Sequence, residues 1–112
     1  MVCTILIVDD ERHIVEVLAG LLEDKGYAVR RAYDGEAALR AVEAAPPDLV
    51  LSDVMMPRLG GVELARRLIS LGIPVVLMSA AVADPGLPGV AFVSKPFDLE
   101  RIVTVAEDLL GR

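Results

Sequence analysis

The sequence predicts an α/β fold in which helices cover both faces of a five-stranded parallel sheet. Two observations support this prediction. Several short apolar runs are continuous rather than alternating, which is typical of strands with both faces covered. Amphipathic patterns with helical spacing lie between most of these runs, so strand and helix alternate along the chain. Because crossovers between parallel strands are right-handed, this alternation predicts a doubly wound sandwich.

The strands are predicted from apolar runs that are too short for helices. In order along the chain, they are expected at residues 5–8, 27–32, 49–51, 75–78 and 90–93. Four of these runs contain no charged residue, as expected for a sheet covered on both faces. The run 27–32 contains Arg30 and Arg31, so we expect it at an edge of the sheet, where one side can contact water.

The helices are predicted from apolar side chains that recur on one face, each pattern being followed by a glycine or proline. In order, the expected buried side chains are Ile14, Leu18, Leu21 and Leu22; Leu39 and Val42; Val62, Ala65, Leu68 and Ile69; and Ile102, Ala106, Leu109 and Leu110. The helices are expected to end at Gly26, Pro46, Gly72 and Gly111. Asp34 and Asp98 are the expected N-caps of the second and last helices.

One connection departs from this alternation. Between the fourth and fifth predicted strands, residues 85–89 contain two prolines and two glycines, which a regular helix does not tolerate. We therefore expect residues 80–89 to form a loop, with a single helical turn at most at residues 80–83.

Length, charge and cysteine content limit the classes of function. A chain of 112 residues is expected to form one domain, residues 1–112. The formal net charge of −6 argues against direct nucleic-acid binding. The longest stretch without a charged residue, residues 68–83, is too short and too interrupted to span a membrane. Cys3 is the single cysteine, and no signal-peptide pattern precedes the first strand, so a cytoplasmic location is expected.

Five polar side chains leave the carboxyl ends of the predicted strands, the edge at which open α/β sheets bind ligands. They are Asp9, Asp10, Asp53, Ser79 and Lys95. Each one alone is more simply explained as a helix cap or a solvated charge. Because all five follow strand ends, they predict a common site.

The expected chemistry of this site follows from its charge. Two unit charges about 4 Å apart repel by about 4 kcal/mol at an effective dielectric constant of 20, so three clustered carboxylates with one lysine need another cation or raised pKa values. A bound divalent metal ion is the simplest answer. Oxygen ligands favour Mg²⁺ or Mn²⁺, and a phosphate oxygen often completes such a coordination shell. Lys95 would attract the phosphate and Ser79 would donate a hydrogen bond to it. Asp53, a single acid after a central strand, is the expected nucleophile that forms an acyl phosphate.

Five motifs occur in an order and at a spacing that resemble one family, the chemotaxis-regulator-like receiver domain of two-component response regulators. They are residues 5–11 (Ile-Leu-Ile-Val-Asp-Asp-Glu), 32–39 (Ala-Tyr-Asp-Gly-Glu-Ala-Ala-Leu), 47–57 (Pro-Asp-Leu-Val-Leu-Ser-Asp-Val-Met-Met-Pro), 61–64 (Gly-Val-Glu-Leu) and 94–97 (Ser-Lys-Pro-Phe). The resemblance implies a flavodoxin-like fold with strand order 2-1-3-4-5. It also implies phosphorelay signal transduction, in which a histidine kinase or histidine phosphotransfer protein is the phosphodonor and a downstream protein reads the state.

The resemblance also implies roles for individual residues. Asp53 would be the phosphoacceptor, and Mg²⁺ would be bound by Asp9, Asp10, Asp53 and the backbone carbonyl of Met55. Ser79 would be the switch hydroxyl.

Three further roles concern the fifth strand and the segment after it. Lys95 would bind the phosphoryl group, and the peptide bond before Pro96 is a candidate for the cis form. Phe92 is expected to be either the switch aromatic or an ordinary core residue.

The sequence departs from the family pattern at two places. Gly60 stands where an acidic residue commonly precedes the glycine at position 61. The segment from Ser79 to Lys95 is about six residues short, so the fourth helix of the family is expected to be shortened or missing. In the family, the face that this helix helps to form often carries the dimer contact and the output signal. The shortened segment therefore leaves both roles of this face undecided for this chain.

Other functions compete with the phosphorelay interpretation. The main alternative is a receiver-like module that binds proteins without phosphate. A phosphohydrolase of the haloacid dehalogenase type would need a second acid at position 55, which is Met55. A flavin site is disfavoured because Asp9, Asp10 and Glu11 would face the flavin phosphate. We therefore expect a phosphoacceptor that promotes its own phosphorylation and dephosphorylation, and no turnover enzyme.

Overall fold

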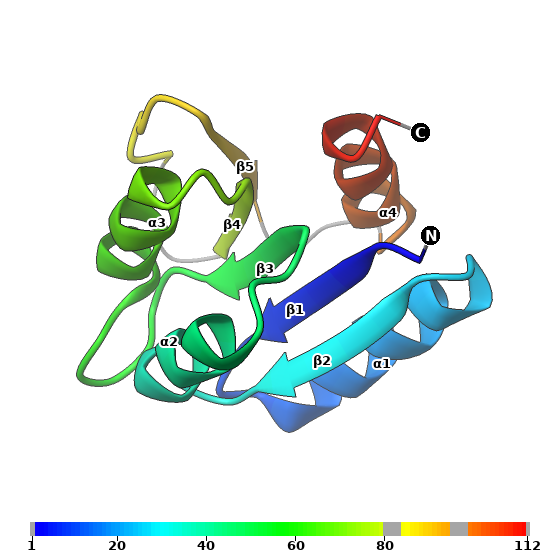
Figure 1. Cartoon of the computed structure of the whole chain (residues 1–112), viewed down its shortest axis with the longest axis horizontal. Helices are drawn as coiled ribbons and strands as arrows, with labels where there is room; N and C mark the ends of the chain where they lie inside the picture. Colours follow the sequence, from blue (N-terminus) through cyan, green and yellow to red (C-terminus); the bar gives the residue numbers. More distant parts are fainter. Residues whose placement is uncertain (1, 80–83, 95–98, 112) are drawn as a thin grey trace.

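The computed structural model describes residues 2–79, 84–94 and 99–111. Strands and helices alternate through most of this part of the chain. In order, the elements are β1 (Thr4–Val8), α1 (Arg12–Asp24), β2 (Ala28–Ala32), α2 (Gly35–Ala44), β3 (Leu49–Asp53), α3 (Gly61–Ser70), β4 (Val75–Ser79), β5 (Val90–Ser94) and α4 (Leu99–Leu109). The strands form one parallel sheet in the order β2-β1-β3-β4-β5, as Figure 1 shows. The predicted fold and strand order are confirmed.

Two apolar cores lie on opposite faces of the sheet. Helices α1 and α4 pack on one face, and α2 and α3 pack on the other. Strand β1 illustrates the division, because Ile5 and Ile7 face the α1/α4 core while Leu6 and Val8 face the α2/α3 core. The continuous apolar runs of the sequence therefore contribute alternately to both cores.

The two arginines of the edge strand β2 bind helices on opposite faces of the sheet. The Arg31 guanidinium donates to the Glu16 carboxylate of α1 at 2.7 Å, which raises the pKa of Arg31. The Arg30 guanidinium donates to the backbone oxygens of Ala41, at 2.6 Å, and Ala45 at the end of α2. The edge position predicted from this pair is confirmed, and the pair ties both helices to the edge.

The described helix boundaries follow the predicted signals, while one side chain expected in the core is exposed. The Asp34 carboxylate accepts a hydrogen bond from the Ala37 backbone N–H at 2.7 Å and so caps α2 as predicted. The predicted cap Asp98 lies outside the described residues. Leu109 was expected in the core but is 41% exposed, because Val103 shares the buried face of α4 instead.

The connection between β4 and β5 contains no helix in its described portion, residues 84–89. The Asp84 carboxylate accepts from the Gly86 backbone N–H at 2.8 Å, and the Val90 N–H donates to the Leu87 carbonyl. The expectation of a shortened or missing helix is confirmed for these residues, while residues 80–83 lie outside the description. None of the helices in the described ranges is long and apolar enough to cross a membrane.

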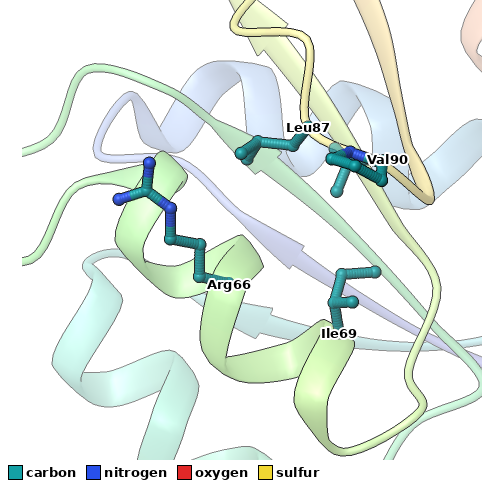
Figure 2. A pocket seen from close by; sticks show the side chains of 5 residues that line it. Arg66, Ile69, Leu87 and Val90 are labelled. Carbon is teal, nitrogen blue, oxygen red and sulfur yellow. The ribbon is translucent and has the colours of Figure 1, made fainter.

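Strand β5 lies at an edge of the sheet and is less covered than its interior neighbour β4. All five residues of β4 are buried, whereas in β5 only Val93 is buried, three residues are partly exposed and Ser94 is exposed. A cavity of about 250 Å³ lies beside β5, lined by Arg66, Ile69, Leu87, Pro88 and Val90. Figure 2 shows that its walls come from α3, from the end of the β4–β5 connection and from Val90 at the start of β5.

Glycine at position 61 is required by close packing. A Cβ atom added there would lie 2.2 Å from the Asp53 backbone oxygen, whereas one added at Gly20, on the exposed side of α1, meets nothing within 4 Å. We expect Gly61→Ala to lower the free energy of unfolding by about 1–3 kcal/mol through overpacking. Gly20→Ala should instead raise it by about 0.5–1 kcal/mol, because alanine loses less backbone entropy in a helix. Urea unfolding of both variants tests this contrast, and equal shifts would contradict it.

Candidate functional site

Three acidic side chains meet where β1 and β3 end. Val8 of β1 pairs with Ser52 of β3, so the residues that follow these positions are neighbours at one edge of the sheet. Asp9, Asp10 and Asp53 each offer a carboxylate oxygen, and these oxygens all lie within 4.8 Å of one another. The structure thus brings together three of the residues that the sequence predicted to share a site.

Backbone hydrogen bonds fix two of these acids. The Asp9 N–H donates to the Ala32 carbonyl at 3.2 Å, and the Asp9 carboxylate accepts from the Glu11 N–H at 2.9 Å. Asp53 is the last residue of β3, and the N–H of the next residue, Val54, donates to the Met78 carbonyl at 3.0 Å. Asp9 and Asp53 are buried and Asp10 is exposed. The sheet therefore sets the positions of Asp9 and Asp53, and Asp10 is accessible to solvent.

The donor set fits a hard divalent cation. It consists of carboxylate oxygens, which Mg²⁺, Mn²⁺ and Ca²⁺ prefer, and contains no histidine or cysteine. The like charges repel one another unless a cation or a proton compensates them. The cluster can therefore hold a metal ion.

The other predicted site residues have different surroundings. Ser79 is buried at the end of β4, and its register partner in β5 is Ser94. Phe92 is partly buried against the α2/α3 core, a packing that fits an ordinary core residue and also a switch residue. Met55, two residues after Asp53, is 57% exposed. Lys95 and Pro96 lie outside the described residues, directly after the end of β5.

The structure also reveals two basic residues near this edge that the sequence patterns did not single out. The Arg12 guanidinium stacks 3.9 Å from the centre of the Tyr33 ring. Arg58, in the loop after β3, has a φ of 63° and donates to the Glu36 carboxylate at 2.6 Å. This hydrogen bond raises the pKa of Arg58, which stays cationic. Neither contact can be predicted from the apolar periodicity of the sequence.

The family model of the response regulator receiver domain matches residues 5–107. The chain belongs to this family. It is 40% identical over 114 residues to the response regulator GtcR of Aneurinibacillus migulanus, with 95% of this chain and 47% of that protein covered. The chain thus spans about half the length of the curated relatives that it matches.

Solved structures agree with this assignment. A putative response regulator from Chloroflexus aurantiacus is 30% identical with a TM-score of 0.86, and both chains are covered completely. The receiver domain of NtrX from Brucella abortus is 34% identical with a TM-score of 0.84, over 96% of this chain and 98% of that one. Phosphorelay signalling is the general function of this family, and the acidic cluster lies within the matched region.

Metal binding is expected to offset the charge repulsion at this site. In the presence of a chelator, Asp10→Asn should raise the free energy of unfolding by about 1 kcal/mol, because it removes one exposed like charge. Mg²⁺ at 100 times its dissociation constant should stabilise the wild type by about 2.7 kcal/mol, and this shift should be reduced in Asp10→Asn. Thermal unfolding with and without Mg²⁺ measures both effects.

Glu43→Gln is the matched control. It makes the same change in net charge near the end of α2, away from the cluster, and should retain the Mg²⁺ shift. An equal Mg²⁺ shift in Asp10→Asn and the wild type would contradict a role for Asp10 in binding the metal.

Proposed function

We propose that this chain is a phosphorelay receiver in which Asp53 takes a phosphoryl group from a phosphohistidine. The observation that supports this is the meeting of three carboxylates at the strand ends of a chain that belongs to the receiver family. In the proposed step, a carboxylate oxygen of Asp53 attacks the phosphorus atom and forms an acyl phosphate. The bond from phosphorus to the donor's histidine nitrogen breaks, and the imidazole leaves.

Asp53 is the best nucleophile of the three acids. Asp53 is the last residue of β3, the central strand. The backbone N–H of the next residue, Val54, donates to the Met78 carbonyl of β4. Asp9 and Asp10 follow the end of β1 instead of lying within a strand, and Asp10 is exposed. A nucleophile on a rigid element loses little freedom when the donor approaches, which favours Asp53.

We assign the metal-binding role to Asp9, Asp10, Asp53 and the backbone carbonyl of Met55, with Mg²⁺ as the expected ion and Mn²⁺ as a substitute. The ion supplies positive charge that lets an anionic phosphoryl group approach an anionic nucleophile. The chain's own contribution is to hold the carboxylates together at the sheet edge.

Three further residues complete the proposal. Ser79 lies at the end of β4 and would donate its hydroxyl to the phosphoryl group, while Lys95 would place its ammonium beside it. By analogy with phosphoserine, the acyl phosphate adds about −1.5 to −2 charges. This added charge would draw the Ser79 hydroxyl and the Lys95 ammonium toward it. Phe92, partly buried on the neighbouring strand, would change its packing in response. The cis form before Pro96 remains an expectation.

The wider assignments rest on the same proposal. Residues 1–112 would form a single receiver domain in the cytoplasm, with a histidine kinase or phosphotransfer protein as donor and a downstream protein as reader. The chain would be a phosphoacceptor and not a turnover enzyme, since Met55 stands where a phosphohydrolase would need a second acid. The alternative is a receiver-like module that binds its partner without phosphate.

Loss of the phosphoacceptor tests this proposal. With Mg²⁺ and a small-molecule phosphodonor, the wild type should gain one phosphoryl mass increment, and Asp53→Asn should gain none because an amide is a poor nucleophile. Intact-protein mass spectrometry measures the increment, and Glu43→Gln is the control that should retain it. An increment that persists in Asp53→Asn would refute the assignment. Equal partner affinity of the wild type and Asp53→Asn would favour the phosphate-independent module.

A further inference from the structure

The loop between β3 and α3, residues 54–60, is fixed at both ends. At its start, the Val54 N–H donates to the Met78 carbonyl of β4 at 3.0 Å. At its end, the Gly61 N–H donates back to the Val54 carbonyl at 2.9 Å. The loop is thus closed at its base, and Met55 is the first residue beyond this closure.

The middle of the loop contacts the start of α2. The Arg58 guanidinium donates to Glu36 at 2.6 Å and lies 3.6 Å from the Asp34 carboxylate. The next residue, Leu59, packs so closely that its carbonyl would lie 2.4 Å from a Cβ atom added at Gly35. Two successive loop residues therefore contact the first turn of α2.

Arg58 has a backbone conformation that its contacts must support. Its φ of 63° lies in the left-handed region, which non-glycine residues seldom adopt. Such conformations persist where surrounding contacts favour them over the alternatives. Ion pairs with Glu36 and Asp34 hold the Arg58 side chain against the start of α2.

We infer that Arg58 is a positioning residue for the metal site, which it serves by tying the β3–α3 loop to α2. Residues 55–57 span the gap between the closed base and Arg58, so the ion pairs limit the conformations of the Met55 carbonyl. The inference rests on the proposed function, because that carbonyl is a proposed ligand. Arg58 itself does not contact the metal or the phosphoryl group in this scheme.

The direction in which Mg²⁺ affinity changes when Arg58 is removed distinguishes positioning from simple electrostatics. Removing a positive charge near an acidic cluster would by itself tighten Mg²⁺ binding. Loss of positioning would weaken it, because the cation would then have to order the loop. A weaker Mg²⁺ affinity in a variant without Arg58 would therefore indicate that the loop has lost its positioning.

The test compares Mg²⁺ affinity in two arginine variants by titration calorimetry. Arg58→Gly removes the guanidinium and keeps the φ of 63° accessible. Arg67→Ala is the matched control, because Arg67 is similarly exposed and pairs with Glu63 within α3 at 3.2 Å. We expect about two- to fivefold weaker Mg²⁺ binding in Arg58→Gly and unchanged or slightly tighter binding in Arg67→Ala. Arg58→Lys, which keeps the charge but not the forked geometry, should fall between Arg58→Gly and the wild type.

Two further measurements make the outcome decisive. Without metal, amide hydrogen exchange of residues 55–60 should be faster in Arg58→Gly than in the wild type. Glu36→Gln removes the main acceptor and should weaken Mg²⁺ binding in the same direction, with little further loss in the double variant. Unchanged or tighter binding in both single variants would overturn the inference and leave the proposed function intact. A wild type that binds no Mg²⁺ would refute the metal site, and the inference with it.

Discussion

The parallel pairing of β1 with β3 places like charges side by side. Residues that leave adjacent parallel strands emerge at the same edge, so Asp9 and Asp53 are neighbours whatever occupies the helical layers. Their repulsion is a cost that the apolar cores on both faces of the sheet offset. The closeness of these carboxylates and their mutual repulsion both result from this one strand pairing.

The surrounding elements restrict movement near these charges. Gly61 lets α3 start directly against the Asp53 backbone, and Arg58 joins the loop before α3 to α2. On the other side of the sheet, Arg31 joins the edge strand to α1. Exposed ion pairs contribute little stability individually, so we regard their main effect as fixing the positions of loops and helices.

The sequence was sufficient to predict the strands, the helices and the acidic cluster because their signals are local. Apolar runs and helical spacing mark each element, and acids directly after strands mark the binding edge. The tertiary details have no such signal. Arg58 pairs with Glu36 across 22 residues and depends on a left-handed backbone conformation. Leu109 has correct helical spacing but is exposed, because the sheet and α1 determine which side of α4 is covered.

The β4–β5 connection shapes the surface of the molecule separately from the pairing of its strands. Although its described residues form no helix, β4 and β5 remain paired in register from Val75 and Val90 to Ser79 and Ser94. The register of these strand ends is thus kept although residues 84–89 of the connection form no helix. The outward surface on this side of the molecule is therefore set by the connection, while the register of the strand ends is set by the sheet.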